Sequence, residues 1–165
     1  MKFVKPDASV FIPDGLAVAD AFRRITHLGI GAHQDDLEIM AFHGIEKCFN
    51  SQDLWFGGVT CTNGGGSPRA GEYASYADEA MAALRRREQE KAAVIGNYGA
   101  LAQLNYTSAE IKDVTTGRLR SDLVQILRAA RPEVVYTHNP ADKHDTHLAV
   151  VFTVLAALRE LPAAE

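Results

Sequence analysis

The order of apolar and polar positions predicts that strands and helices alternate along this chain. Short apolar runs rich in β-forming residues are each followed by a longer segment whose apolar positions recur at helical spacing. We expect strands at residues 25–31, 54–62, 101–106 and 133–137, the last one buried, and helices at residues 15–24, 36–50, 76–98, 117–130 and 147–161. This alternation is typical of an α/β fold: a Rossmann-like, three-layer arrangement around a mostly parallel sheet.

The segments between these elements carry capping and turn residues. Residues 1–13 contain two prolines and predict an irregular arm, after which Asp14 is a suitable N-cap for the first helix. Thr115 or Thr116 is suited to cap the helix at 117–130. Residues 63–68 include three consecutive glycines, so we expect a mobile loop there.

Length and charge narrow the class of protein. The 165 residues (1–165) are enough for a single domain with its own core. The net charge of −4 argues against a nucleic-acid partner, because phosphate backbones are bound by basic surfaces. No apolar run is long enough to span a bilayer and no signal peptide is visible, so we expect a cytoplasmic protein. Cys48 and Cys61 are then expected to be reduced thiols in the core.

Side chains suited to metal binding and proton transfer gather in two clusters, each directly after a predicted strand. One follows the strand at 25–31, and the other follows the strand at 133–137 and extends from His138 to His147. Because parallel strands end at the same edge of a sheet, we expect the two clusters to meet there. The side chains expected at this edge are His33, Asp35, Asp36, Asp142, His144 and His147.

This combination indicates a catalytic zinc site rather than a structural one. Catalytic zinc ions are held by three nitrogen or oxygen ligands and keep one position open for water. The neighbours Asp35 and Asp36 allow one carboxylate to bind the metal while the other serves as a base. Spacing alone does not say which of the two has which task.

Both clusters resemble motifs of the LmbE/PIG-L family of zinc-dependent de-N-acetylases. The first is similar to the family's Ala-His-Pro-Asp-Asp signature and reads Ala32-His33-Gln34-Asp35-Asp36-Leu37-Glu38-Ile39. Residues 131–147 are similar to Arg-Pro-Asp-Val-Val followed by His-x-Pro-x-Asp-x-His-x-x-His. Between them, residues 60–64 resemble a Thr-Asn-Gly turn, and Arg85-x-x-Glu88 resembles an Arg-x-x-Glu helix. The resemblance covers about residues 26–160.

The resemblance implies a role for each residue of the clusters. Zn²⁺ would be bound by His33, Asp36 and His147, and Asp35 would be the general base. His144 would stabilise the tetrahedral intermediate or protonate the leaving amine. Metal-bound water would attack the acetamide carbonyl of an N-acetylated sugar conjugate, typically of the N-acetylglucosamine type, and acetate would be released.

Further residues are expected around this centre. Arg85, Asn63 and Gly64 would contact the substrate, and Asp142 and Asp145 would support the ligating and catalytic histidines through hydrogen bonds. The expected partner is a small N-acetylated glycoconjugate whose aglycone the sequence does not indicate. A homo-oligomer is an open alternative to a monomer, because free sheet edges favour self-association.

The chain departs from the family pattern in three ways. Gln34 replaces the usual proline, and Asp145 and Thr146 stand where many members carry proline and aspartate. If that aspartate tunes His144, Asp145 is the residue that could take over its task. The chain also ends soon after the second motif, so we expect the C-terminal part of the family domain to be missing.

Two other functions fit parts of the sequence. A relative of the family that keeps the metal site without catalysis would bind a metal or a sugar and release no acetate. A nucleotide-binding Rossmann domain would use the glycine loop at 63–68, although this loop lacks the Gly-x-Gly-x-x-Gly spacing and a following Lys-Ser/Thr.

Overall fold

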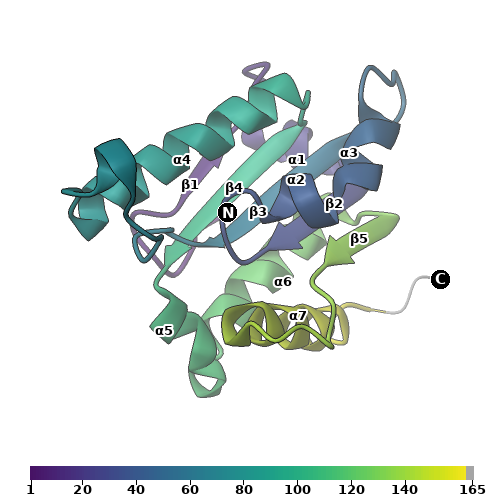
Figure 1. Cartoon of the computed structure of the whole chain (residues 1–165). Helices are drawn as coiled ribbons and strands as arrows, with labels where there is room; N and C mark the ends of the chain where they lie inside the picture. The colour runs from purple at the N-terminus through teal and green to yellow at the C-terminus, as the bar shows by residue number, and fades with distance from the viewer. Residues whose placement is uncertain (163–165) are drawn as a thin grey trace.

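The computed structural model, which describes residues 1–162, has a five-stranded sheet between two layers of helices (Figure 1). The strand order is β1-β4-β3-β2-β5; β2 to β5 run parallel, and β1 pairs antiparallel with β4. The strands are β1 (Ser9–Phe11), β2 (His27–Gly31), β3 (Phe56–Thr62), β4 (Ala100–Tyr106) and β5 (Val134–Thr137). The predicted α/β class with a mostly parallel sheet is therefore confirmed.

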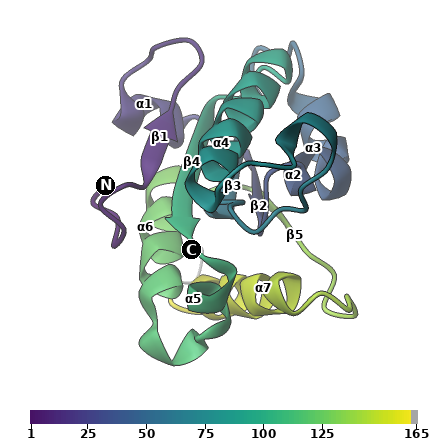
Figure 2. The ribbon, with the colours of Figure 1, turned by 60° about the vertical axis from the view of Figure 1, so that its left-hand side comes forward.

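Helices cover both faces of the sheet, and each face has its own apolar core (Figures 1 and 2). The core on one face includes Leu37, Ile45, Phe56 and Tyr98, and it lies under α2 (Asp36–Met40), α3 (Phe42–Cys48) and α4 (Asp78–Ile95). The larger core lies under α1 (Val18–Arg23), α5 (Ser108–Lys112), α6 (Arg118–Ala130) and α7 (Asp145–Leu158). Two short 3₁₀ turns, η1 (Gly71–Tyr73) and η2 (Val114–Thr116), complete the described elements.

The order of the strands creates a crevice at one end of β2. The chain passes from β2 to β3 and β4 on one side, and it then returns through α6 to place β5 on the other side of β2. Neighbouring parallel strands whose connections leave in opposite directions open a gap at their carboxyl ends, and ligands of open α/β sheets bind there. Both predicted chemical clusters follow these two strands.

The N-terminal part differs from the sequence prediction. The arm expected at 1–13 contains the edge strand β1, because its residues pair with β4. Asp14 is not the cap of the first helix, which begins at Val18. Instead Asp14 accepts a hydrogen bond from the N–H of Leu16 and pairs with Arg24 at 2.7 Å. The prediction that Asp14 caps the helix was therefore wrong, because its carboxylate accepts a hydrogen bond within the turn that precedes the helix.

Two further expectations about helices need correction, and one helix was not expected. The helix expected up to residue 50 is broken at Ala41, whose φ and ψ of −109° and 14° are not helical. Helix α5 was not predicted, although Thr107 and Glu110 form a capping box at its start. Neither Thr115 nor Thr116 caps α6, because both lie in η2 and the N-cap is Gly117 with φ 63°.

Strand β5 is not the buried strand that its apolar sequence predicts. It pairs only with β2 among the described strands, and Val134 is 37% exposed while Val135 to Thr137 are half-buried. A run of β-forming residues does not reveal whether a strand has neighbours on both sides. The two cysteines, in contrast, are buried free thiols as expected.

A search of the described helices for one that is both long and apolar enough to cross a membrane finds none.

Close packing of α3 on the sheet leads to a stability prediction. A Cβ atom at Gly44 would lie 2.5 Å from the ring of Tyr136 and 3.2 Å from the ring of Phe56. Gly44→Ala should lower the free energy of unfolding by about 1–2 kcal/mol, because displacing the rings outweighs the higher helix propensity of alanine. Denaturant unfolding measures the change. Gly66→Ala is the matched control, since nothing lies within 4 Å of a Cβ there; equal stability of the two variants would contradict the packing argument.

Candidate metal centre

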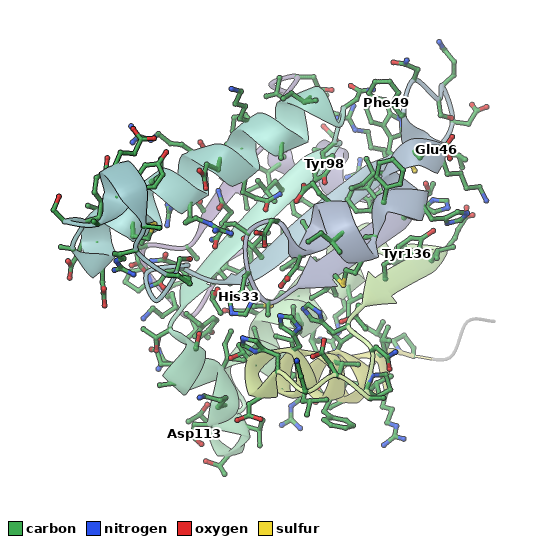
Figure 3. All side chains as sticks on the ribbon, in the orientation of Figure 1. His33, Glu46, Phe49, Tyr98, Asp113 and Tyr136 are labelled. Carbon is green, nitrogen blue, oxygen red and sulfur yellow. The ribbon has the colours of Figure 1, made fainter. Side chains whose placement is uncertain are left out.

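The four parallel strands end at the same edge, and the residues that follow them line a cleft of about 1300 Å³. His33 follows β2, Asn63 follows β3 and Thr107 follows β4, while α4 and α7 contribute Arg85 and His147. In Figure 3, His33 lies at the end of the sheet and faces α7. The fold thus brings the two sequence clusters together, as their positions after parallel strands predicted.

Three side chains converge beside this cleft, which His33 and His147 line. The Nδ1 atom of His33 lies 3.2 Å from Nε2 of His147 and 3.4 Å from Oδ2 of Asp36. The Nε2 atom of His147 lies 3.6 Å from Oδ1 of Asp36. Tetrahedral ligands about 2.0–2.1 Å from one zinc ion are separated by about 3.3–3.4 Å. These three residues, whose side chains are between 11% and 24% exposed, therefore fit a single metal ion.

Asp142 prepares His147 for this role. Its Oδ2 lies 2.9 Å from Nδ1 of His147, and its Oδ1 accepts a hydrogen bond from the N–H of His144. Because a carboxylate only accepts hydrogen bonds, Nδ1 of His147 carries the proton and Nε2 presents a free lone pair to the centre. The hydrogen bond with His147 and the one from the His144 backbone lower the pKa of Asp142.

His138 lies beneath the centre and supports it. Its Nε2 accepts a hydrogen bond from the N–H of Ala32 at 2.8 Å, and its ring stacks on His147 with 3.9 Å between centroids and 10° between planes. A second group with metal-ligand spacing combines His138, Asp142 and His147. We favour the group of His33, Asp36 and His147 for two reasons. The stacked rings of His138 and His147 direct their lone pairs alongside one another instead of toward a shared ion. The Nε2 atom of His138 also already accepts the N–H of Ala32.

The two neighbouring aspartates have different surroundings. The Asp36 side chain is 11% exposed. Burial favours its protonated form, but the nearby imidazoles of His138 and His33 and the N–H of His33 outweigh this and hold its pKa well below the usual range. The Asp35 side chain is 63% exposed and lies 3.2 Å from Nη2 of Arg85. Asp36 is thus arranged as an anionic ligand, and Asp35 remains accessible from the cleft.

His144 is the N-cap residue of α7 and lies at the mouth of the centre. Its ring stacks on His147 at 4.4 Å and meets the ring of His33 edge-on at 5.1 Å. Burial and the two neighbouring imidazoles lower its pKa. His144 and His147, both expected at this edge of the sheet, are therefore in contact.

The other predicted residues occupy different places around the cleft. Arg85, Asn63 and Gly64 line it, and Arg85 also donates a hydrogen bond to the carbonyl of Gln34. Asp145 is exposed in the first turn of α7, and within residues 1–162 it makes no hydrogen bond to a histidine. The carboxylate that supports the histidines is that of Asp142.

The glycine loop borders the cleft but is not followed directly by a helix. Residues 64–66 line its wall, whereas the next α-helix begins only at Asp78. A phosphate in this loop would therefore lack the helix N-terminus that Rossmann-type nucleotide sites supply.

Sequence reasoning missed a buried polar group on α4. Gln89 is 1% exposed, and its side chain contacts the backbone of Asp35 and the carboxylate of Glu38. The motif comparison drew attention to Glu88, which is exposed and pairs with Arg85. Helical spacing could have indicated Gln89, because it lies four residues after Arg85 and four before the buried Ala93.

Comparison with known protein families places both sequence clusters in one family domain. The family model of the GlcNAc-PI de-N-acetylases (PIG-L) matches residues 28–158, which contain both clusters. A search among curated proteins finds no match.

Solved structures share the fold. N,N'-diacetylchitobiose deacetylase from Pyrococcus horikoshii, solved with an inhibitor, is 24% identical, with a TM-score of 0.69 over 87% of this chain and 53% of that one. The A40926 pseudoaglycone deacetylase Dbv21 is 21% identical, with a TM-score of 0.62 over 83% and 60%. The 4-carboxy-2-hydroxymuconate hydratase GalB from Pseudomonas putida KT2440 is 20% identical, with a TM-score of 0.67 over 81% and 55%. The present chain thus spans a little over half the length of these proteins.

The ligand assignment leads to a prediction that separates the two metal groups. His33→Gln should weaken binding of Zn²⁺, used as a probe, at least about a hundredfold, because a ligand is lost. His138→Gln should leave the affinity within a few-fold of wild type, since an amide oxygen can accept the bond from Ala32. Calorimetric titration of the two His→Gln variants measures this, and the reverse order of affinities would identify the group around His138 as the ligands.

The hydrogen bond behind His147 leads to a second prediction. Asp142→Asn should weaken Zn²⁺ binding about tenfold or more, because a neutral amide no longer holds the proton on Nδ1 of His147 as firmly. Asp145→Asn is the matched control and should bind Zn²⁺ as wild type does. Equal losses in both variants would indicate a general effect of negative charge near the centre.

Proposed function

The chain belongs to the GlcNAc-PI de-N-acetylase (PIG-L) family, and on that premise we propose that it is a zinc-dependent hydrolase that deacetylates an N-acetylated sugar of the N-acetylglucosamine type. The observation that carries the proposal is the approach of His33, Asp36 and His147 to within 3.2–3.6 Å of one another, with an exposed carboxylate beside them. Zinc bound there would polarise a carbonyl oxygen and lower the pKa of a coordinated water to about 7.

The residues of the chain have separate tasks in the proposed reaction. Asp35 is accessible from the cleft and takes the proton from the water that attacks the acetamide carbon. As the new C–O bond forms, His144 stabilises the charge that develops on the carbonyl oxygen. The C–N bond then breaks, and a proton delivered by His144 or Asp35 leaves with the nitrogen, so that the products are acetate and a free amine.

The cleft next to the centre is the proposed binding site for the sugar. Its wall includes Arg85, Asn63 and Gly64. Arg85 offers a guanidinium and Asn63 an amide, and the absence of a side chain at Gly64 lets the sugar come close to the backbone. Gly64 has φ +71°, and a Cβ there would clash with the side-chain oxygen of Gln34. Only glycine therefore fits this turn, and we assign to the loop that follows β3 a part in holding the acetylated ring.

The related folds also include a hydratase, so the fold alone does not determine the reaction. The proposal of deacetylation rests on the family match and on the side chains of the centre. Zinc binding without acetate release from any sugar would instead favour a non-catalytic, metal-binding relative.

Replacement of the proposed base tests the mechanism. Asp35→Asn should reduce acetate release from N-acetylglucosamine derivatives about a hundredfold or more, while Zn²⁺ affinity changes little because Asp35 is not a ligand. Acetate release is measured with and without a chelator across a panel of derivatives. Asp53→Asn, an exposed aspartate before β3, is the control. Wild-type activity in the Asp35→Asn protein would exclude the assigned role.

A further inference from the structure

Asp35 has a backbone conformation that needs support from its surroundings. Its φ of 81° is left-handed, which non-glycine residues adopt rarely and keep only where neighbouring groups hold them. It is also the N-cap residue of α2, yet its side chain makes no capping hydrogen bond. The carboxylate therefore serves no N–H of its own helix and lies in the cleft, where it pairs with Arg85, so the backbone must be held by other groups.

Gln89, in α4, holds this backbone through a hydrogen bond. Its Oε1 accepts the N–H of Asp35 at 3.1 Å, and its Nε2 donates to Oε1 of Glu38 at 2.8 Å. The same oxygen of Glu38 accepts the hydroxyl of Tyr98 at 2.6 Å. Gln89 and Tyr98 are 1% and 2% exposed, and in Figure 3 Tyr98 lies between α4 and the sheet.

The direction of this network is fixed. Glu38 accepts from both partners, so Gln89 must turn its amide nitrogen toward Glu38 and its oxygen toward Asp35. Burial and the negative charge of Glu38 raise the pKa of Tyr98, which keeps its hydroxyl a donor. Gln89 consequently has one orientation, and the N–H of Asp35 has one acceptor.

The arrangement is a capping box with an inserted residue. In a capping box the glutamate at the third helical position accepts the backbone N–H of the N-cap residue. Asp35 and Glu38 occupy these two positions of α2. Here the side-chain amide of Gln89, from α4, lies between them: it accepts the N–H of Asp35 and donates to the carboxylate of Glu38.

We propose that Gln89 is a positioning residue that bridges Asp35 and Glu38 and thereby fixes the left-handed turn that directs the Asp35 carboxylate into the cleft. This inference rests on the proposed function, in which Asp35 is the general base. The bridge itself does not depend on that function, so the two can be tested separately.

Gln89→Met keeps the size of the side chain and removes both hydrogen bonds. We expect kcat for acetate release to fall about tenfold to a hundredfold, with KM and Zn²⁺ affinity nearly unchanged. In the metal-free protein, hydrogen exchange of the Asp35 amide, followed by NMR, should become faster. Gln125→Met is the matched control, because Gln125 is half-buried in α6 and accepts a hydrogen bond from the N–H of Lys2, away from the cleft; it should alter neither quantity.

Exchanging the two groups of the bridge provides a rescue test. Gln89→Glu alone places two carboxylates against each other and should impair kcat and amide protection as Gln89→Met does. Adding Glu38→Gln restores one donor and one acceptor, because the new amide at position 38 would then donate to the new carboxylate at position 89. The double variant should recover most of both quantities, whereas a general packing role would give additive losses.

The outcomes separate the inference from the proposed function. Unchanged exchange of the Asp35 amide in Gln89→Met, or no recovery in the double variant, would overturn the bridge. Absence of acetate release by the wild-type protein, with the exchange results as expected, would overturn the proposed function alone. If Gln89→Met does not fold, the comparison of Gln89→Glu with the double variant decides the question.

Discussion

The close approach of two imidazoles and one carboxylate is the constraint on which the rest of this structure depends. Ligand atoms 3.2–3.6 Å apart leave little room for water between them, and the negative charge of the largely buried Asp36 would be costly without its partners. Rigid elements must therefore supply the geometry. His33 and Asp36 follow β2 directly, and the chain reaches His147 from the neighbouring β5, so both sides of the centre are fixed by adjacent strands.

Residues around the proposed metal ligands hold these ligands in place. Asp142 sets the tautomer of His147, and His138 joins the backbone of Ala32 to the underside of the His147 ring. Helix α4 holds the turn after β2, because its residues Arg85 and Gln89 both contact Asp35 in this turn. His147 and the turn that carries Asp35 are thus held by neighbouring residues that are not proposed as metal ligands, as precise metal and acid–base sites require.

The sequence predicted those features that depend on local pattern and on the direction of parallel strands. It identified the α/β fold, and it anticipated that His33 and His147 would meet, since both follow strands that end at one edge. It could not reveal that β5 is an edge strand, because neighbours across a sheet are not encoded in the strand itself. Gln89 was missed for a related reason: its partners lie about fifty positions away, and only the packing of α4 and α2 on the same face of the sheet brings them into contact.

The same packing resolves an ambiguity that spacing left open. Asp35 and Asp36 are chemically identical neighbours, yet α2 begins between them, so their side chains leave the backbone in different directions. Asp36, the first helical residue, points inward to the imidazoles, whereas Asp35 precedes the helix in a left-handed turn and remains exposed. The carboxylate of an N-cap aspartate ordinarily accepts hydrogen bonds from N–H groups in the first turn of its helix. Because Gln89 and Glu38 hold this turn through its backbone N–H instead, the Asp35 carboxylate is left available to the cleft, and two identical side chains acquire different roles.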